Sequence, residues 1–410
     1  MTSQTQRPTL KLVQFSILQM CIIASYGFAR PVTDSLFLQH HTSQNLPKVF
    51  LLSAVATALA MVAYNHFNTR YSLLRLLGAS ALVSIVVMLL CLLCYHLQVP
   101  GSVYMLYVWR EVYMILLVEI FWSLADTLFS IKTARTSYGV VLGIGSMGGF
   151  LINLLVGPLS AAYGSKMALL GVVPCLGLCA FLTWKFSKSL DGAPVFVKKS
   201  KKSIGFQSLA VVKNSKYLVP LLFLIAVVQI SISLVDLQFN TILEVSYPDV
   251  DARTGMIGRV HAVIDVLATF LQFFAGFVIK LLGTGGVFVG IPLFLGTALL
   301  GFIAFPQFLS VALLKISSKC FDYSIFRASK EMLYIPLNQL EKTQGKALID
   351  ILIYRVAKSS AALLMIFLIA IQFSNYTMHI ALCLMVIWIL LAVTIVKRYK
   401  SVVDLYNEES

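Results

Sequence analysis

The sequence predicts an all-α membrane protein with twelve transmembrane helices in two six-helix halves. Three observations support this: the apolar composition, the number of long apolar runs, and the placement of Lys and Arg. Of the 410 residues, 59% are hydrophobic and 12% are charged, and the mean hydropathy is +0.87. Soluble domains carry roughly a quarter charged residues. Helices that are apolar on all faces need lipid or a very large core around them, so the composition excludes an ordinary soluble fold.

Twelve apolar runs have the length of a membrane span. A helix needs about 20 apolar residues to cross the bilayer core, because each backbone polar group must be satisfied within the segment. The expected spans are residues 12–30, 48–66, 73–96, 103–129, 137–163, 167–186, 217–243, 258–281, 285–305, 307–326, 349–372 and 377–396.

Basic residues orient these spans, since cytoplasmic loops hold the excess of Lys and Arg. With a cytoplasmic N-terminus, the outer loops keep only Lys48, Lys166, Arg253 and Arg259. We therefore expect both termini in the cytoplasm. The first apolar run leads directly into further spans rather than following a transit peptide, which favours the inner (cell) membrane of a bacterium.

A long basic connection divides the chain. We expect a first six-helix half at residues 1–186, a basic cytoplasmic linker at 187–216, a second half at 217–400 and a cytoplasmic tail at 401–410. This layout is typical of major-facilitator-type transporters, in which the substrate binds near mid-membrane between two rocking halves. The net charge of +15 therefore reports loop orientation and contact with membrane lipid, and it predicts no nucleic-acid partner.

Several charged side chains lie inside the expected spans, where each costs on the order of 3 kcal/mol. In the fourth span, Glu111, Glu119 and Asp126 fall within roughly 80° of one another around the helix. In the seventh, Gln229, Ser233, Asp236 and Asn240 form a polar stripe. The basic members are Arg30, Arg110, Lys315, Lys319, Arg355 and Lys358. Retained charges of this kind usually face a partner or a polar pathway.

These residues suit transport of an anion, because guanidinium groups clamp phosphate and ammonium groups act as point charges. The acids could relay protons or balance a second cation, and the residues alone leave these roles open. No nucleophile with a base, metal cluster or Walker loop is found, so we predict neither an enzyme nor a cofactor. Gly139, Gly143, Ser146, Gly149 and Asn153 are expected to let two helices approach closely.

The segment "DYSIFRASKEMLYIPLNQLEKTQGKALIDILIYRVAKSSAALL" resembles the most characteristic block of the ATP/ADP translocase family of plastids and obligate intracellular bacteria. That block has the form KYSxFDxxKEMAYIPL, then KxKGKAAID, then RxGKSGG. The matching positions include Lys330, Glu331, Pro336, Asp350 and Lys358. "YVWREVYMILLVEIFWSLAD", "FARPVTDSLFL" and "SLVDLQFNTILEVSYP" are similar to the family's segments in spans 4, 1 and 7.

The resemblance implies ADP,ATP carrier-like exchange of nucleotides by alternating access. Together with the intramembrane charges, it gives the candidate residues for substrate binding or coupling: Arg30, Asp34, Glu111, Glu119, Asp236, Asn240, Lys315, Lys319, Lys330, Arg355 and Lys358. Thr33, Asn240 and Asp322 stand where the family has lysine. Two alternatives stay open: a proton-coupled transporter of another anionic metabolite, and a non-transporting membrane sensor or scaffold.

Overall fold

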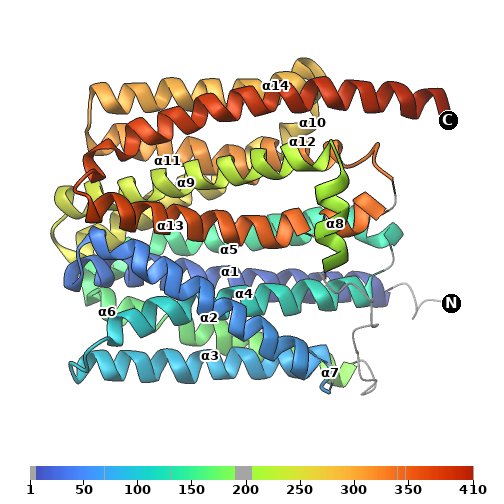
Figure 1. Cartoon of the computed structure of the whole chain (residues 1–410). Helices are drawn as coiled ribbons and strands as arrows, with labels where there is room; N and C mark the ends of the chain where they lie inside the picture. The colour runs from blue at the N-terminus through green and yellow to red at the C-terminus, as the bar shows by residue number, and fades with distance from the viewer. Residues whose placement is uncertain are drawn as a thin grey trace. The chain divides into compact units, whose positions relative to one another are not determined.

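A computed structural model describes residues 6–68, 70–129, 131–189, 206–338, 340–346 and 348–409. Within these ranges the regular structure is entirely helical (Figure 1). Much of the expected linker, residues 190–205, lies outside the described residues.

The helices follow one another with short connections. In the first part of the chain they are α1 (Gln6–His40), α2 (Leu46–Asn68), α3 (Leu73–His96), α4 (Ser102–Leu128), α5 (Ile131–Tyr163), α6 (Ser165–Leu169) and α7 (Val172–Ser189). Then come α8 (Phe206–Asn214), α9 (Leu218–Ser246), α10 (Val250–Ala304), α11 (Phe308–Tyr323), α12 (Ile325–Leu333), α13 (Tyr354–Ala370) and α14 (Thr377–Glu409). Two π-helical segments, Glu341–Gly345 and Leu348–Ile353, lead into α13.

The all-α membrane fold is confirmed. Among the described residues, nine helical segments are long and apolar enough to cross a membrane. One of them, α10, contains two spans that meet at Gly283, where a φ of 70° breaks the helix at the boundary expected from the sequence. Two further expected spans are not among the nine. One is α4, which contains four charged residues, and the other is α11, which has only 16 residues. These segments correspond to the twelve expected spans.

The first helix continues past the expected end at Arg30, through Pro31 to His40. A proline removes one backbone donor, and other groups must satisfy the carbonyls near the distortion. The Thr33 hydroxyl donates to the carbonyl oxygen of Ala29 at 2.8 Å, and Arg110 Nη1 donates to that of Arg30 at 3.2 Å. The extension keeps Asp34 on the helix.

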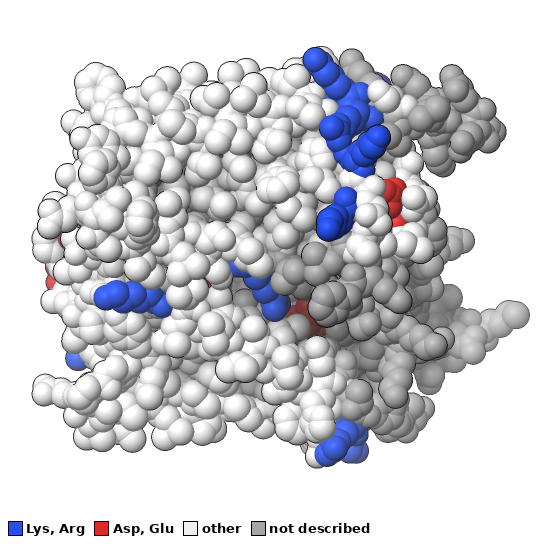
Figure 2. All heavy atoms as spheres, in the orientation of Figure 1, with Lys and Arg blue, Asp and Glu red and all other residues white. Residues whose placement is uncertain are grey.

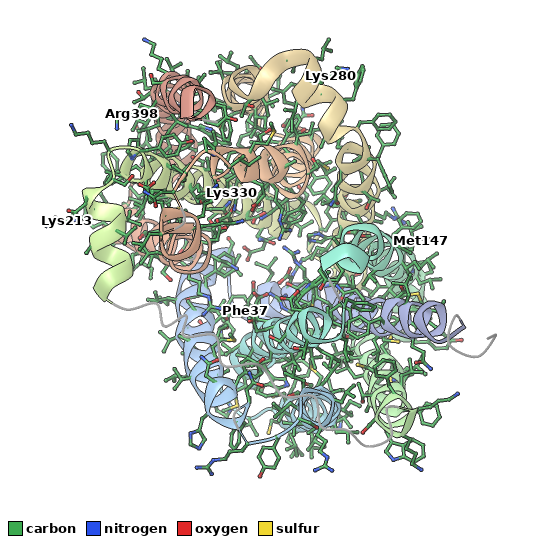
Figure 3. The ribbon with its side chains drawn as sticks, turned by 90° about the vertical axis from the view of Figure 1, so that its right-hand side faces the viewer. Phe37, Met147, Lys213, Lys280, Lys330 and Arg398 are labelled. Atoms are coloured by element: carbon green, nitrogen blue, oxygen red, sulfur yellow. The ribbon has the colours of Figure 1, made fainter. Side chains whose placement is uncertain are left out.

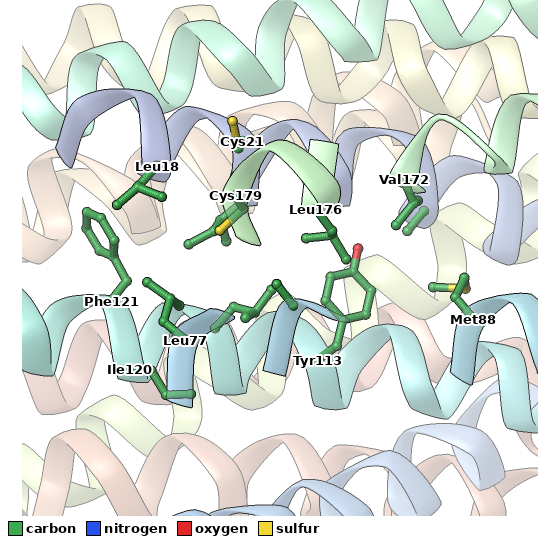
Figure 4. Close-up of a cluster of buried hydrophobic side chains, with 14 of the residues drawn as sticks. Leu18, Cys21, Leu77, Met88, Tyr113, Ile120, Phe121, Val172, Leu176 and Cys179 are labelled. Atoms are coloured by element: carbon green, nitrogen blue, oxygen red, sulfur yellow. The ribbon is translucent and has the colours of Figure 1, made fainter. Parts of the chain in front are cut away.

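The chain forms two compact units. Unit 1 comprises Met1–Thr42, Leu52–Ser200 and Tyr247–Val266; unit 2 comprises Ser43–Leu51, Lys201–Ser246 and Leu267–Ser410. The core of unit 1 lies where α1, α3, α4 and α7 pack together (Figure 4). Its buried side chains include Leu18, Cys21, Leu77, Tyr113, Ile120, Phe121, Leu176 and Cys179. This apolar packing fixes the rotation of α1 and α4, which contain the charged residues of unit 1.

Unit 2 is organised around α9, which packs against α11, α13 and α14. Aromatic rings join its other helices: the Phe326 ring lies 5.8 Å from the Trp388 ring and 5.5 Å from the Phe288 ring, centroid to centroid. Trp388 and Phe326 are each 1% exposed, and Phe288 is fully buried. Such packing holds α12, which begins the family-like block, against α10 and α14.

Large apolar side chains also cover the surface. On α10, Phe273, Phe277 and Leu281 are 79%, 65% and 71% exposed. Figure 2 shows broad uncharged areas over the described part of one face. Apolar surface of this extent belongs in contact with lipid, in agreement with a multi-pass membrane protein.

Close packing of α1 against α5 involves one of the expected glycines, Gly149, together with Gly148, which is not in the expected set. A Cβ added at Gly139 or Gly143 would meet nothing within 4 Å. At Gly148 it would lie 2.5 Å from Met20 Cγ and 2.8 Å from the Met20 carbonyl oxygen, and at Gly149 it would lie 2.8 Å from Ile23 Cγ2. The close-approach face therefore includes Gly148 and Gly149. The spacing of small residues predicts that α5 approaches another helix closely. Which face of α5 makes the contact depends on its packing against α1.

We expect Gly148→Ala to lower the free energy of unfolding by about 1–3 kcal/mol, because the added methyl group would overlap the α1 backbone. Gly143→Ala is the matched control, since its methyl group would enter open space. Thermal unfolding of the purified proteins in detergent measures the difference. Equal midpoints for the two variants would contradict the proposed contact.

Candidate substrate-binding site

Unit 1 contains a cluster of four charged side chains on α1 and α4: Arg30, Asp34, Arg110 and Glu111. Arg110 is at its centre and is 2% exposed. Its Nη1 donates to Asp34 Oδ1 at 2.5 Å, and its Nη2 donates to Glu111 Oε1 at 2.7 Å. Arg30 Nε lies 3.9 Å from Asp34 Oδ2. We call this set the unit 1 cluster; it holds two bases and two acids.

Aromatic and hydroxyl groups complete the surroundings of Arg110. Its guanidinium carbon lies 4.0 Å from the Tyr107 ring centroid, and Nη1 also donates to the Thr33 hydroxyl at 2.8 Å. The Tyr26 hydroxyl donates to Glu111 Oε1 at 3.2 Å. A guanidinium with fixed neighbours on this many sides is pre-oriented, so little side-chain entropy remains to be lost on ligand binding.

Unit 2 contains a second cluster, on α9 and α11. Asp236 forms ion pairs with two lysines: Lys319 Nζ lies 2.6 Å from Oδ2, and Lys315 Nζ lies 3.6 Å from Oδ1. Lys315 is 3% exposed, and its Nζ lies 3.9 Å from the Phe239 ring centroid. One turn along α11, Asp322 Oδ1 accepts a hydrogen bond from Gln229 Nε2 at 3.0 Å. Asp236, Lys315, Lys319 and Asp322 are the unit 2 cluster.

Much of the charge in the family-like block is paired within the block itself. Lys330 Nζ lies 2.8 Å from Asp350 Oδ1, the Tyr334 hydroxyl donates to the same oxygen at 3.4 Å, and Lys346 pairs with Glu331. Lys330 is 4% exposed and lies in the interior of unit 2, whereas Lys280 and Arg398 extend outward (Figure 3). These pairs join α12 to the segment that precedes α13. The charged residues of the block therefore stabilise the connection between α12 and α13.

Replacing Lys330 with Met should lower the free energy of unfolding by about 1–3 kcal/mol, because Asp350 would lose its charged partner. Lys280→Met removes the same charge from an exposed position on α10 and serves as the control. Chemical unfolding in detergent compares the two. A similar small loss in both variants would exclude a structural role for the Lys330–Asp350 pair.

The structure places the other predicted residues in different surroundings. Glu119 is exposed and lies two turns beyond Glu111 on α4. Asn240 is buried, and its Nδ2 donates to the Asp236 carbonyl oxygen at 2.8 Å. Arg355 is half-buried on α13, and Lys358 is exposed with its Nζ 5.2 Å from the Phe50 ring centroid. Of the predicted set, three residues therefore belong to each cluster.

Three groups near the clusters were missing from the predicted site. The sequence indicates Arg110 as a base inside a span but does not place it among the binding residues, although it connects both acids of the unit 1 cluster. Asp322 stands out in the sequence only as a departure from the family block. Asp265 on α10 accepts a hydrogen bond from Asn153 on α5 at 2.9 Å. An acid or base inside an apolar run is a detectable signal, but its partner lies far away in sequence.

Chemically, both clusters present cationic groups that can bind a phosphate or carboxylate, with acids beside them that compete for the same cations. Nothing in either arrangement supplies a nucleophile activated by a base. The geometry therefore favours recognition of an anionic or polar solute rather than covalent chemistry.

Residues 99–399 match the family model described as TLC ATP/ADP transporter. The chain is 28% identical over 293 residues to ADP,ATP carrier protein 1 of Chlamydia trachomatis, covering 61% of this chain and 55% of that protein. It is 20% identical over 481 aligned positions to ADP,ATP carrier protein 3 of Rickettsia conorii, covering 98% of this chain and 96% of that one. The chain thus spans about half the length of the Chlamydia carrier that it matches.

Among solved structures, a bacterial homologue of the iron transporter ferroportin in an inward-facing state has a TM-score of 0.71 at 13% identity, covering 96% of this chain and 99% of that one. A similarity at this identity shows the fold alone, which is major-facilitator-like. Because the family model matches well over half of its length, this chain belongs to the TLC ATP/ADP transporter family.

Proposed function

We propose that the protein exchanges nucleotides across a membrane by alternating access. The observation that carries this proposal is the presence, in a TLC family chain, of buried basic clusters on α1 and α4 of unit 1 and on α9 and α11 of unit 2. These helices are the first and fourth expected spans of each predicted half, and in major-facilitator folds such spans line the central pathway. The curated relatives are named as ADP,ATP carriers, which supports nucleotide substrates and transport rather than catalysis.

Within this proposal, each cluster, considered in its own unit, supplies groups that bind polar parts of the substrate. Lys330 acts mainly through its pair with Asp350, and Arg355 and Lys358 lie on α13 close to the same block in sequence. The predicted six-helix halves, 1–186 and 217–400, would be the two parts that rock about the substrate. The excess of basic residues in the expected inner loops supports cytoplasmic termini. An inner (cell) membrane of a bacterium is proposed with them, as expected from the sequence.

Vesicle uptake tests the proposal. Purified protein is reconstituted into liposomes that are either empty or loaded with an unlabelled nucleotide. Labelled adenosine, AMP, ADP and ATP are then offered one at a time. Exchange predicts rapid uptake of at least one of the nucleotides into loaded vesicles, with little uptake into empty ones. Uptake that follows a pH gradient and ignores the internal nucleotide would instead favour the proton-coupled alternative, and no uptake of any compound by folded protein would leave the sensor or scaffold.

A further inference from the structure

The two clusters resemble each other in their charge balance. In the unit 1 cluster the positive charges of Arg30 and Arg110 meet the negative charges of Asp34 and Glu111. In the unit 2 cluster the positive charges of Lys315 and Lys319 meet the negative charges of Asp236 and Asp322. Lys330 and Arg327 also act on Asp322, but Lys330 is paired with Asp350 and Arg327 is exposed. Counted over its four named side chains, each cluster is therefore neutral.

The pairing is close enough to occupy the cations. Arg110 and Lys315 are 2% and 3% exposed, and the side chain of Lys319 is 12% exposed. Ion pairs at 2.5 Å and 2.6 Å, at Asp34 and Asp236, use the donor directions that a phosphate oxygen would otherwise take. A phosphate that bound Arg110 or Lys319 along these directions would displace a carboxylate, which would then lose its own partner.

A nucleoside triphosphate brings about four negative charges, and a monophosphate about two. Inside a membrane protein, each uncompensated charge is costly, so a polyanion requires a surplus of cations. Neither set of four described side chains has such a surplus. The ribose and base, in contrast, require only hydrogen bonds and stacking, which neutral paired charges and the partly exposed ring of Tyr26 can supply.

From this charge balance we infer that the substrate carries few phosphate groups: a nucleoside or a nucleoside monophosphate is bound in preference to a di- or triphosphate. The inference rests on the proposed function, since it names the substrate class of the same site. Asp34 and Asp236 act as internal counterions that exclude polyanions.

The test compares adenosine, AMP, ADP and ATP at equal concentration, as competitors of labelled AMP uptake into AMP-loaded vesicles and as ligands that raise the unfolding temperature of the purified protein. The wild-type protein should be inhibited and stabilised by adenosine or AMP at concentrations about tenfold below those of ATP. Two variants alter the charge balance: Asp34→Asn removes an acid from the unit 1 cluster, and Asn240→Lys adds a base one turn from Asp236. Each should move the preference toward ADP and ATP by about tenfold.

Asp126→Asn is the matched control, because Asp126 is an exposed acid on α4 that pairs with the Tyr138 hydroxyl outside the cluster. It should leave the order of preference unchanged. Wild-type protein that prefers ATP or ADP would overturn the inference while leaving nucleotide exchange intact. A low-charge preference that persists in both Asp34→Asn and Asn240→Lys would also overturn it, because the counterions would then not set the selectivity. Absence of both exchange and stabilisation with all four compounds would overturn the proposed function itself. For a variant that folds but does not transport, the rise in unfolding temperature with each compound shows which compound it prefers.

Discussion

Arg110→Met is expected to abolish exchange and to lower the free energy of unfolding by about 3–5 kcal/mol. The reason is geometric: one guanidinium that is 2% exposed holds two carboxylates, Asp34 at 2.5 Å and Glu111 at 2.7 Å. Removing it leaves two negative charges close together on α1 and α4. Removing one partner of a buried ion pair is far more costly than the net stabilisation that the pair provides.

A conservative replacement separates charge from geometry. Arg110→Lys keeps the positive charge, but a single ammonium nitrogen cannot reproduce the fork that reaches Asp34, Thr33 and Glu111 at once. We expect it to retain most of the stability while the exchange rate falls by roughly tenfold. Arg259→Met, at an exposed arginine of α10, is the control for loss of an arginine. Wild-type exchange in Arg110→Lys would contradict the role given to the fork.

The second large effect is expected at Asp236, which holds both lysines of the unit 2 cluster. Asp236→Asn would leave Lys315 and Lys319 side by side without their common counterion, and we expect a loss of about 3 kcal/mol or more in unfolding free energy. Lys319→Met alone should cost less, because Lys315 stays 3.6 Å from the same carboxylate.

A double-mutant cycle measures this coupling. In the protein that combines Asp236→Asn with Lys319→Met, one buried base and its acid are removed together, so the loss should be smaller than the sum of the single losses by at least about 1 kcal/mol. Unfolding of the four proteins in detergent gives the coupling energy. Additive losses would show that the two side chains do not stabilise each other, whatever their separation.

The fold was predictable because it depends on local chemistry. Long apolar runs must form helices in lipid, and Gly283 alone, with its positive φ, divides α10 near the expected boundary. Pro31 shows the limit of local rules. A proline predicts a helix end, yet α1 continues to His40, and Thr33 and Arg110 donate to the nearby carbonyls of Ala29 and Arg30. Arg110 lies 80 residues from Arg30 in sequence.

The site was predictable as a set of residues but not as a set of contacts. Apolar surroundings indicate Arg110 and Asp236 as charges kept inside a span, which is rare. Asp34 lies beyond the expected end of the first span and is indicated by its match to the family segment. The pairing of Asp34 with Arg110 depends on how α1 and α4 are rotated by their packing, and an acidic stripe on α4 cannot reveal this. Glu119 shares that stripe and is exposed. The roles of these residues in binding, and the division into halves at 187–216, stay predictions.

The most direct measurement is the exchange activity of the wild-type protein beside Arg110→Lys in the same vesicles. The nucleotide that wild-type protein takes up fastest is used as label, and uptake into loaded vesicles is divided by uptake into empty ones. A ratio well above one for wild type, with a much slower rate for Arg110→Lys, is the expected result. A ratio near one for wild-type protein that is folded and inserted would contradict nucleotide exchange through these clusters.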